Sequence, residues 1–341
     1  MLRGSLSRAL ERGTLRGPAA RALSALWQEV ADPVRPVALP VGARVVGVGG
    51  ATLGGAGKTP LVLALAREVS RRRPVAVVAH AYRARVGSAR VVRVDDPAKQ
   101  VGDEAAWLAR ALHPLTVVVG RDRSAALALA ARHAGTVIVD GLLQARPERL
   151  DLALLCVDAR APWGNRLCPP AGDLRARVGR LLDAADALVV GGPPLELQAG
   201  ALPCHRVEST LVGARDSGGQ LVRLEAIRTA RVGLVLAIAR PERVLTELRC
   251  HAVEPAAVEL HADHACIPER PVARVEAWLT TAKCATKLGP HRRGAPVWVL
   301  EHRVSLPEEL VAMVSGAAPS PPVPDRARLP AGSRARQGAP R

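Results

Sequence analysis

The residues best suited to chemistry follow a valine-rich segment near the start of the chain. The string "TLGGAGKT", residues 52–59, places glycines directly before a lysine and a threonine. Glycine reaches positive φ values without steric cost, so successive N–H groups can turn inward and bind phosphate at the start of a helix. Lys58 then supplies positive charge for the β- and γ-phosphates, and the Thr59 hydroxyl is a ligand for Mg²⁺. The spacing predicts a phosphate-binding loop for ATP or GTP, made of Thr52, Gly54, Gly55, Ala56, Gly57, Lys58 and Thr59.

Acidic residues at three later places are candidates for the metal and for proton transfer. Asp140 ends an apolar run, as a metal-binding carboxylate at the end of a strand does. Asp103 and Glu104 open a predicted helix, where the aspartate can act as a helix cap or as a catalytic base or metal ligand. Asp263 and His264 are adjacent in a predicted loop that offers no fourth ligand at zinc spacing. This pair indicates a base or a proton partner.

Predicted strands alternate with helices and must position these residues. The strands centre near Val45, Val75, Thr116, Val137, Ala153 and Leu188. This alternation predicts an α/β fold of the P-loop NTPase type, a mostly parallel sheet with helices on both faces, over residues 36–203. Residues 204–225 read as a β-ribbon around a Ser-Gly-Gly turn, and residues 226–316 as a smaller C-terminal α/β domain with strands at 231–238 and 297–304. Residues 317–341, rich in Pro, Ala, Gly and Arg, are expected to be disordered.

Composition narrows the partners of the chain. The net charge is +17, carried by 44 Arg and four Lys out of 48 basic residues, which favours an anionic partner. Base-stacking aromatics are scarce, with no Phe, one Tyr and five Trp, so we expect no nucleic acid to bind. No apolar run reaches the ~18 residues that a spanning helix needs, and no export signal is recognisable, so a cytoplasmic location is expected.

The N-terminal segment, residues 1–35, has a basic amphipathic pattern. Apolar residues recur at helical spacing at Leu2, Leu6, Leu10, Ala19, Leu23, Leu26 and Val30, among Arg3, Arg8, Arg12, Arg16 and Arg21. Such a helix can lie in the headgroup region of an anionic membrane, or it can pack on the nucleotide domain as an ordinary surface helix.

Taken in order, these motifs resemble the tetraacyldisaccharide 4′-kinases of lipid A biosynthesis. The phosphate loop of that family has the form T-x-G-G-x-G-K-T-P, with Thr where other P-loops have Gly, and Thr52 through Pro60 match it. The likeness extends over about residues 40 to 312 through "VGDE" (101–104), "VDGLLQ" (139–144), "LDLALLCVDA" (150–159), "GNRLCPPAGDLR" (164–175), "LAIARPERV" (236–244), "HADH" (261–264) and "LTTAKCATKL" (279–288).

The resemblance implies transfer of the ATP γ-phosphoryl group to the 4′-hydroxyl of a tetraacyldisaccharide 1-phosphate, giving lipid IVA. By this likeness Asp103 accepts the hydroxyl proton with help from His264, and closure of two domains assembles the site. Thr59, Asp140 and Glu104 would hold Mg²⁺, and Gln144 would support the nucleotide. The likeness also implies a peripheral protein, expected to be a monomer, on the cytoplasmic face of the bacterial inner membrane.

Three departures from the family pattern leave an alternative open. Gly141 stands where the family has a second aspartate, Ala176 where it has a glutamate, and Cys284 where it has an aspartate. A catalytically weakened relative that still binds nucleotide and membrane is therefore a second hypothesis, since phosphoryl transfer depends on positioning and charge neutralisation. A P-loop GTPase is a third, although the guanine-reading string N-K-x-D does not occur.

Overall fold

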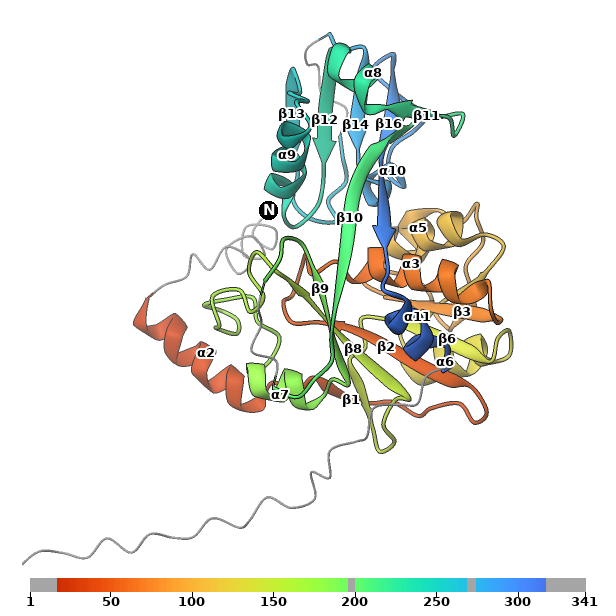
Figure 1. Cartoon of the computed structure of the whole chain (residues 1–341), viewed down its shortest axis with the longest axis vertical. Helices are drawn as coiled ribbons and strands as arrows, with labels where there is room; N and C mark the ends of the chain where they lie inside the picture. Colours follow the sequence, from red (N-terminus) through yellow and green to blue (C-terminus); the bar gives the residue numbers. More distant parts are fainter. Residues whose placement is uncertain (1–16, 196–199, 269–273, 317–341) are drawn as a thin grey trace, which may run out of the picture.

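The computed structural model describes residues 17–195, 200–268 and 274–316. Two α/β halves are stacked end to end, and strands pass between them without a break (Figure 1). The predicted N-terminal residues Leu2, Leu6 and Leu10 and the predicted disordered tail 317–341 lie outside the described residues.

Fourteen strands form the main sheet, and a separate two-stranded sheet joins β1 (Val34–Pro36) to β7 (Gln144–Arg146). The strands of the main sheet are β2 (Arg44–Gly50), β3 (Val75–Ala79), β4 (Arg90–Val91), β5 (Thr116–Val119), β6 (Thr136–Asp140), β8 (Leu152–Asp158), β9 (Ala187–Gly191), β10 (Cys204–Arg215), β11 (Leu221–Arg223), β12 (Val232–Leu236), β13 (Ala257–Leu260), β14 (Ala277–Thr280), β15 (His291–Arg292) and β16 (Ala295–Ser305). The helices are α2 (Pro18–Val30), α3 (Lys58–Ser70), α4 (Ala98–Val101), α5 (Asp103–Leu112), α6 (Arg123–Ala131), α7 (Val178–Asp183), α8 (Leu224–Thr229), α9 (Pro241–Cys250), α10 (Ala282–Ala285) and α11 (Glu308–Ser315).

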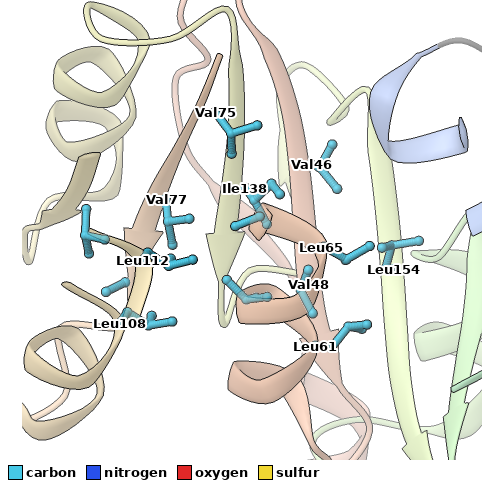
Figure 2. Close-up of a cluster of buried hydrophobic side chains, with 14 of the residues drawn as sticks. Val46, Val48, Leu61, Leu65, Val75, Val77, Leu108, Leu112, Ile138 and Leu154 are labelled. Atoms are coloured by element: carbon cyan, nitrogen blue, oxygen red, sulfur yellow. The ribbon is translucent and has the colours of Figure 1, made fainter. Parts of the chain in front are cut away.

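The first half is a parallel sheet in the order β9-β8-β2-β6-β3-β5, with β4 antiparallel at its edge. Its strands are nearly continuous apolar runs because helices cover both faces. Val46 and Val48 of β2 face Leu61 and Leu65 of α3 in one core (Figure 2), whereas Val45 belongs to the core under α6 on the other face. The predicted parallel sheet with helices on both faces is confirmed.

The link between the halves is more extensive than a hairpin. Strand β10 pairs with β9 in parallel at one end, and β11 pairs back on β10 around the predicted turn. Most of its length pairs antiparallel with β16, from Glu208 opposite Ser305 to Arg215 opposite Val299. The predicted ribbon is therefore one strand of a larger unit whose main partner comes from the other end of the chain, a pairing that local sequence does not reveal.

The end of the described chain returns to the first half. Helix α11 buries Leu310, Val311 and Val314 in the same core as α3. Arg44 of β2 donates to the carbonyls of Met313 (2.9 Å) and Val314 (3.2 Å), which places a cation at the negative end of that helix. The sequence-based boundary assigned residues 226–316 to the second domain, but residues 308–315 pack with the first.

Helix α2 lies at the periphery of the first half (Figure 1). Its only buried residue is Ser24, whose hydroxyl donates to the Cys168 carbonyl. The apolar side chains Leu23, Leu26, Trp27 and Val30 are all more than half exposed. Among the helices of the described residues, none is both long and apolar enough to cross a bilayer.

The packing of α11 on α3 generates a stability prediction. We expect Leu310→Ala to lower the stability of the first half by about 2–5 kcal/mol, because the side chain is fully buried in that core. In this variant, amide hydrogen exchange should speed up relative to wild type more in α3 than in β12. The matched variant Leu248→Ala, fully buried in the second half, should show the reverse. Faster exchange confined to the second half in Leu310→Ala would contradict this assignment of α11.

Candidate active site

The glycine loop between β2 and α3 has the backbone that its sequence predicts. Gly55 and Gly57 have φ of +68° and +78°, a region that other residues rarely adopt. A Cβ on Gly54 would lie 3.1 Å from Ala239 of the second half, so this glycine allows the two halves to approach closely. The loop therefore meets the second half as well as forming the start of α3.

Thr52 closes the loop. Its hydroxyl donates to the Gly54 carbonyl at 3.0 Å, and its own carbonyl accepts from Arg175 Nε at 2.9 Å. Arg175 also donates to the Leu53 carbonyl, which ties the loop to the segment that follows β8. The threonine at this position thus shapes the loop from within.

Lys58 begins α3 and folds back toward the loop. Its Nζ would lie 3.2 Å from a Cβ on Gly50, which explains a glycine at the end of β2. Burial lowers the pKa of Lys58, and the charge of Arg175 acts in the same direction, whereas Asp140 opposes it. An anion bound in the loop would offset this cost by pairing with the buried cations.

Thr59 and Asp140 form the pair expected of a magnesium site. The Thr59 hydroxyl donates to Asp140 Oδ2 at 2.7 Å. Asp140 Oδ1 is buried and has no hydrogen-bond partner among the described residues. Burial raises the pKa of Asp140, and the negative charge of Glu104 raises it further. A hard cation with oxygen ligands fits here because it would satisfy the unpaired carboxylate oxygen and offset the burial of its charge.

Asp103 and His264 meet although 161 residues separate them. His264 Nδ1 lies 2.9 Å from both carboxylate oxygens of Asp103. The Lys283 ammonium is 3.0 Å from His264 Nε2, and an ammonium can only donate. In a neutral imidazole the ring proton is therefore on Nδ1, where it is donated to Asp103.

The charges around this pair hold the carboxylate ionised. Burial alone raises the pKa of Asp103, but the hydrogen bond from His264 and the charge of Lys283 outweigh it, so the pKa lies well below its ordinary value. Lys287 Nζ lies 2.8 Å from Asp103 Oδ2. Lys283 also pairs with Asp263 at 3.1 Å and with Glu104 at 3.3 Å. Lys283, which belongs to the second half, thus forms ion pairs with acidic residues of both halves.

A second set of contacts joins the halves across the glycine loop. Arg243 at the start of α9 contacts Asp158 and donates to the Gly55 carbonyl. Arg240, directly before α9, donates to Asp173 Oδ2 at 2.7 Å. These ion pairs hold the second half against the phosphate loop.

The structure brings most predicted site residues together. The loop, Thr59 and Asp140 form one group, and Asp103, His264 and Glu104 form another that is electrostatically coupled to the first. Gln144 differs, because its side-chain amide is occupied by the backbone of Ala145, Leu150 and Ala184. Among the described residues its side chain makes no hydrogen bond with another predicted site residue, so its role toward the nucleotide stays a prediction.

The positions that depart from the family pattern have local explanations. A side chain on Gly141, which has φ +80°, would meet the His80 ring, since a Cβ there would lie 2.4 Å from His80 Cδ2. Ala176 is fully buried, and an alanine supplies no carboxylate to the site at that position. Cys284 Sγ accepts the backbone N–H of Ala237 at 3.2 Å, so the thiol holds the second half together locally.

The family string "LTTAKCATKL" contains Lys283 and Lys287, but the sequence analysis assigned no role to either lysine or to His80. The scarcity of lysine was the available signal for the first two, since two of the four lysines of the chain lie beside Asp103. For His80 no sequence signal stood out. Its place beside Gly141 follows only from the pairing of β3 with β6.

The low pKa of Asp103 generates a pH prediction. A carboxyl whose pKa is lower in the folded protein stabilises it above the unfolded pKa of about 4, and this contribution is lost as the pH falls through the folded value. Asp103→Asn should therefore reduce the free energy of unfolding by about 3–5 kcal/mol at pH 7, with a shrinking difference from wild type below about pH 4.

Urea titrations at several pH values measure this difference. Glu254→Gln, at an exposed residue, is the control and should show little change. A wild-type advantage that stays constant down to pH 3 would contradict the assigned charge state.

Known proteins resemble this chain over most of its length. The model of the family described as Tetraacyldisaccharide-1-P 4′-kinase matches residues 21–318. A tetraacyldisaccharide 4′-kinase of Methylorubrum populi is 36% identical over 284 residues, covering 76% of this chain and 81% of that protein. One from Geobacter metallireducens is 35% identical over 268 residues, covering 72% of this chain and 79% of that protein.

A solved structure supports the fold separately. The crystal structure of the "apo" form of LpxK from Aquifex aeolicus in complex with ATP superposes with a TM-score of 0.69 at 21% identity. The match covers 92% of this chain and 98% of that one. The family model and the two relatives lead to one conclusion: this chain belongs to the tetraacyldisaccharide 4′-kinase family.

Proposed function

We propose that this protein transfers the γ-phosphoryl group of ATP to the 4′-hydroxyl of tetraacyldisaccharide 1-phosphate, which makes lipid IVA for lipid A biosynthesis. Family membership supports this activity. The observation that carries it is the contact of Asp103 with His264 beside a phosphate loop. A carboxylate held by an imidazole from the other half would be able to receive a hydroxyl proton.

The phosphate loop would hold the nucleotide. Inward N–H groups at Gly55 and Gly57 and the Lys58 ammonium offer donors to phosphate oxygens. Thr59 and Asp140 would hold Mg²⁺, with Glu104 nearby, and the ion would neutralise charge on the phosphates. The unpaired Asp140 Oδ1 supports this placement.

Asp103 would accept the proton of the attacking hydroxyl. The sugar oxygen forms a bond to the γ-phosphorus, the bond to the leaving ADP oxygen breaks, and the proton passes to the carboxylate. A carboxylate of lowered pKa is a weak base, so the transfer must be late, after the new O–P bond has acidified the hydroxyl. His264, with its proton on Nδ1, would orient Asp103, and Lys283 would fix that tautomer.

Because these contacts join residues of the two halves, the site would be productive only when the halves are closed on each other. Asp103 and the loop belong to the first half, whereas His264, Lys283 and Arg243 belong to the second. Opening would separate the base from its orienting residue and expose the phosphates to water. Closure around both substrates would protect the transfer from hydrolysis.

Helix α2 would bring the active site to a membrane. Its exposed apolar residues Leu23, Leu26, Trp27 and Val30 form a surface that a bilayer interface would cover. The high positive charge of the chain favours anionic lipid. We therefore propose a peripheral location on the cytoplasmic face of the bacterial inner membrane, where the lipid substrate lies. A monomer and the absence of nucleic-acid binding stay predictions.

The weakened relative remains the competing hypothesis because Gly141, Ala176 and Cys284 stand where the family has three carboxylates. Family membership gives the GTPase hypothesis no support. One assay separates the kinase from the weakened relative.

Transfer of labelled γ-phosphate from ATP to detergent-solubilised tetraacyldisaccharide 1-phosphate tests the activity. Asp103→Ala should lower kcat by roughly 10²- to 10⁴-fold, because it removes the base. Lys58→Ala should reduce kcat/KM by roughly 10²-fold or more through loss of phosphate charge stabilisation. Lys99→Ala, an exposed lysine on α4, is the matched control and should retain wild-type rates. ATP binding without turnover by the wild type would establish the weakened relative instead.

Membrane binding is tested by sedimentation with vesicles of anionic phospholipid. The double variant Leu26→Ser with Trp27→Ser should bind at least about tenfold more weakly, because two exposed apolar side chains no longer enter the interface. Leu260→Ser, at a half-exposed position of the second half, should bind as wild type does. Equal loss in both variants would argue against α2 as the contact.

A further inference from the structure

His80 is a partly buried titratable residue that the proposed mechanism does not use. It directly follows β3, which pairs in parallel with β6 so that Val78 lies opposite Val139. His80 is therefore level with Gly141, the residue after Asp140. Because β6 also pairs with β2, which leads into the phosphate loop, His80 belongs to the strand ends that surround the phosphate site.

The hydrogen bonding of His80 determines which ring nitrogen carries the proton. Its Nδ1 accepts the backbone N–H of Tyr82 at 3.1 Å. The neutral ring must then carry its proton on Nε2. Among the described residues Nε2 has no hydrogen-bond partner. Its N–H is therefore free to donate to a bound group.

The charges that act on the ring include those of the phosphate site, in agreement with its place at the strand ends. Burial lowers the pKa of His80 to about 4, and the charges of Arg123, Arg175 and Lys58 act in the same direction, against Glu104. Lys58 and Glu104 are also the neighbours of Asp140. Arg123 Nη1 is itself buried without a partner. The imidazole is thus neutral, and an anion would fit beside it better than another cation.

Gly141 makes room for the ring. A Cβ at residue 141 would lie 2.4 Å from His80 Cδ2 and 3.4 Å from Nε2, so this edge of the ring faces the end of β6. A side chain at residue 141 and the present position of His80 are mutually exclusive. The glycine and the histidine therefore form one arrangement.

We propose that His80 is a phosphate-contacting residue whose Nε2–H donates to a phosphate oxygen of the nucleoside triphosphate, and that Gly141 is required to admit it. The proposal rests on the proposed kinase function for its substrate. A neutral donor here stabilises phosphate charge without repelling a cation held by Asp140.

Three variants of the full chain separate the donor from the bulk of the ring. His80→Ala removes the donor, His80→Asn keeps only a group near Nδ1, and His80→Gln keeps an amide N–H near Nε2. We expect Ala and Asn to lower kcat/KM for ATP roughly 10- to 100-fold, as loss of a hydrogen bond to a charged group does, and Gln to stay within a few-fold of wild type. The melting temperatures of the three variants should stay close to that of the wild type, and they should not follow the order of the activities.

Glycine replacements test the shared space. Gly42 has φ +81° and no atom within 4 Å of an added Cβ, so Gly42→Ala measures the backbone strain alone. Gly141→Ala adds the collision with His80 and should cost much more activity than Gly42→Ala does. In the His80→Ala background this excess should vanish, which a double-mutant cycle measures.

Binding of a fluorescent ATP analogue in the same variants keeps the outcome independent of turnover. If the wild type binds nucleotide but transfers nothing, the proposed function fails, and weaker binding in Ala and Asn but not in Gln still supports the His80 contact. Wild-type kinetics and affinity in His80→Ala would overturn it. Equal loss in all three variants together with lower melting temperatures would also overturn it, because the ring would then be only structural.

Discussion

The arrangement depends on one contact, the hydrogen bond from His264 of the second half to the Asp103 carboxylate of the first. It exists only if the two halves are held in one orientation. The shared strands β10 and β16 supply a continuous hydrogen-bonded link between them, and Arg240 and Arg243 add ion pairs beside the phosphate loop. The architecture therefore brings an imidazole across a domain boundary to a carboxylate near the phosphate loop.

Charge balance is the second organising principle. Several partly buried cations lie around the loop, and burial lowers the pKa of Lys58, Arg123 and Arg175. A buried charge is costly unless it is paired. Around Asp103 the charge is balanced internally, by Lys283 and Lys287, whereas near the loop an Asp140 oxygen and an Arg123 nitrogen have no hydrogen-bond partner among the described residues. This difference supports the proposed roles, in which Asp103 would act as the base and the loop would receive a magnesium nucleotide.

The departures from the family pattern acquire physical meaning in this setting. The space beside Gly141 is filled by the His80 ring, so the missing side chain leaves no void. Cys284, which stands where the family has an aspartate, accepts one backbone N–H within the second half. A chain can thus lose residues typical of its family while the geometry around Asp103 and the phosphate loop is kept.

The sequence by itself determined the local units. Glycine spacing, apolar runs ending in Asp140 and the alternation of strands and helices predicted the loop, the parallel sheet and most site residues, because these features depend on backbone sterics and nearby periodicity. Only the tertiary structure decided the return of α11 to the first half, the pairing of β10 with β16 and the internal hydrogen bonding of Gln144. It alone also brought Lys283 to His264 and His80 to Gly141. Such contacts join residues far apart in the chain, and they form because packing and charge pairing are settled over the whole molecule rather than within a local window.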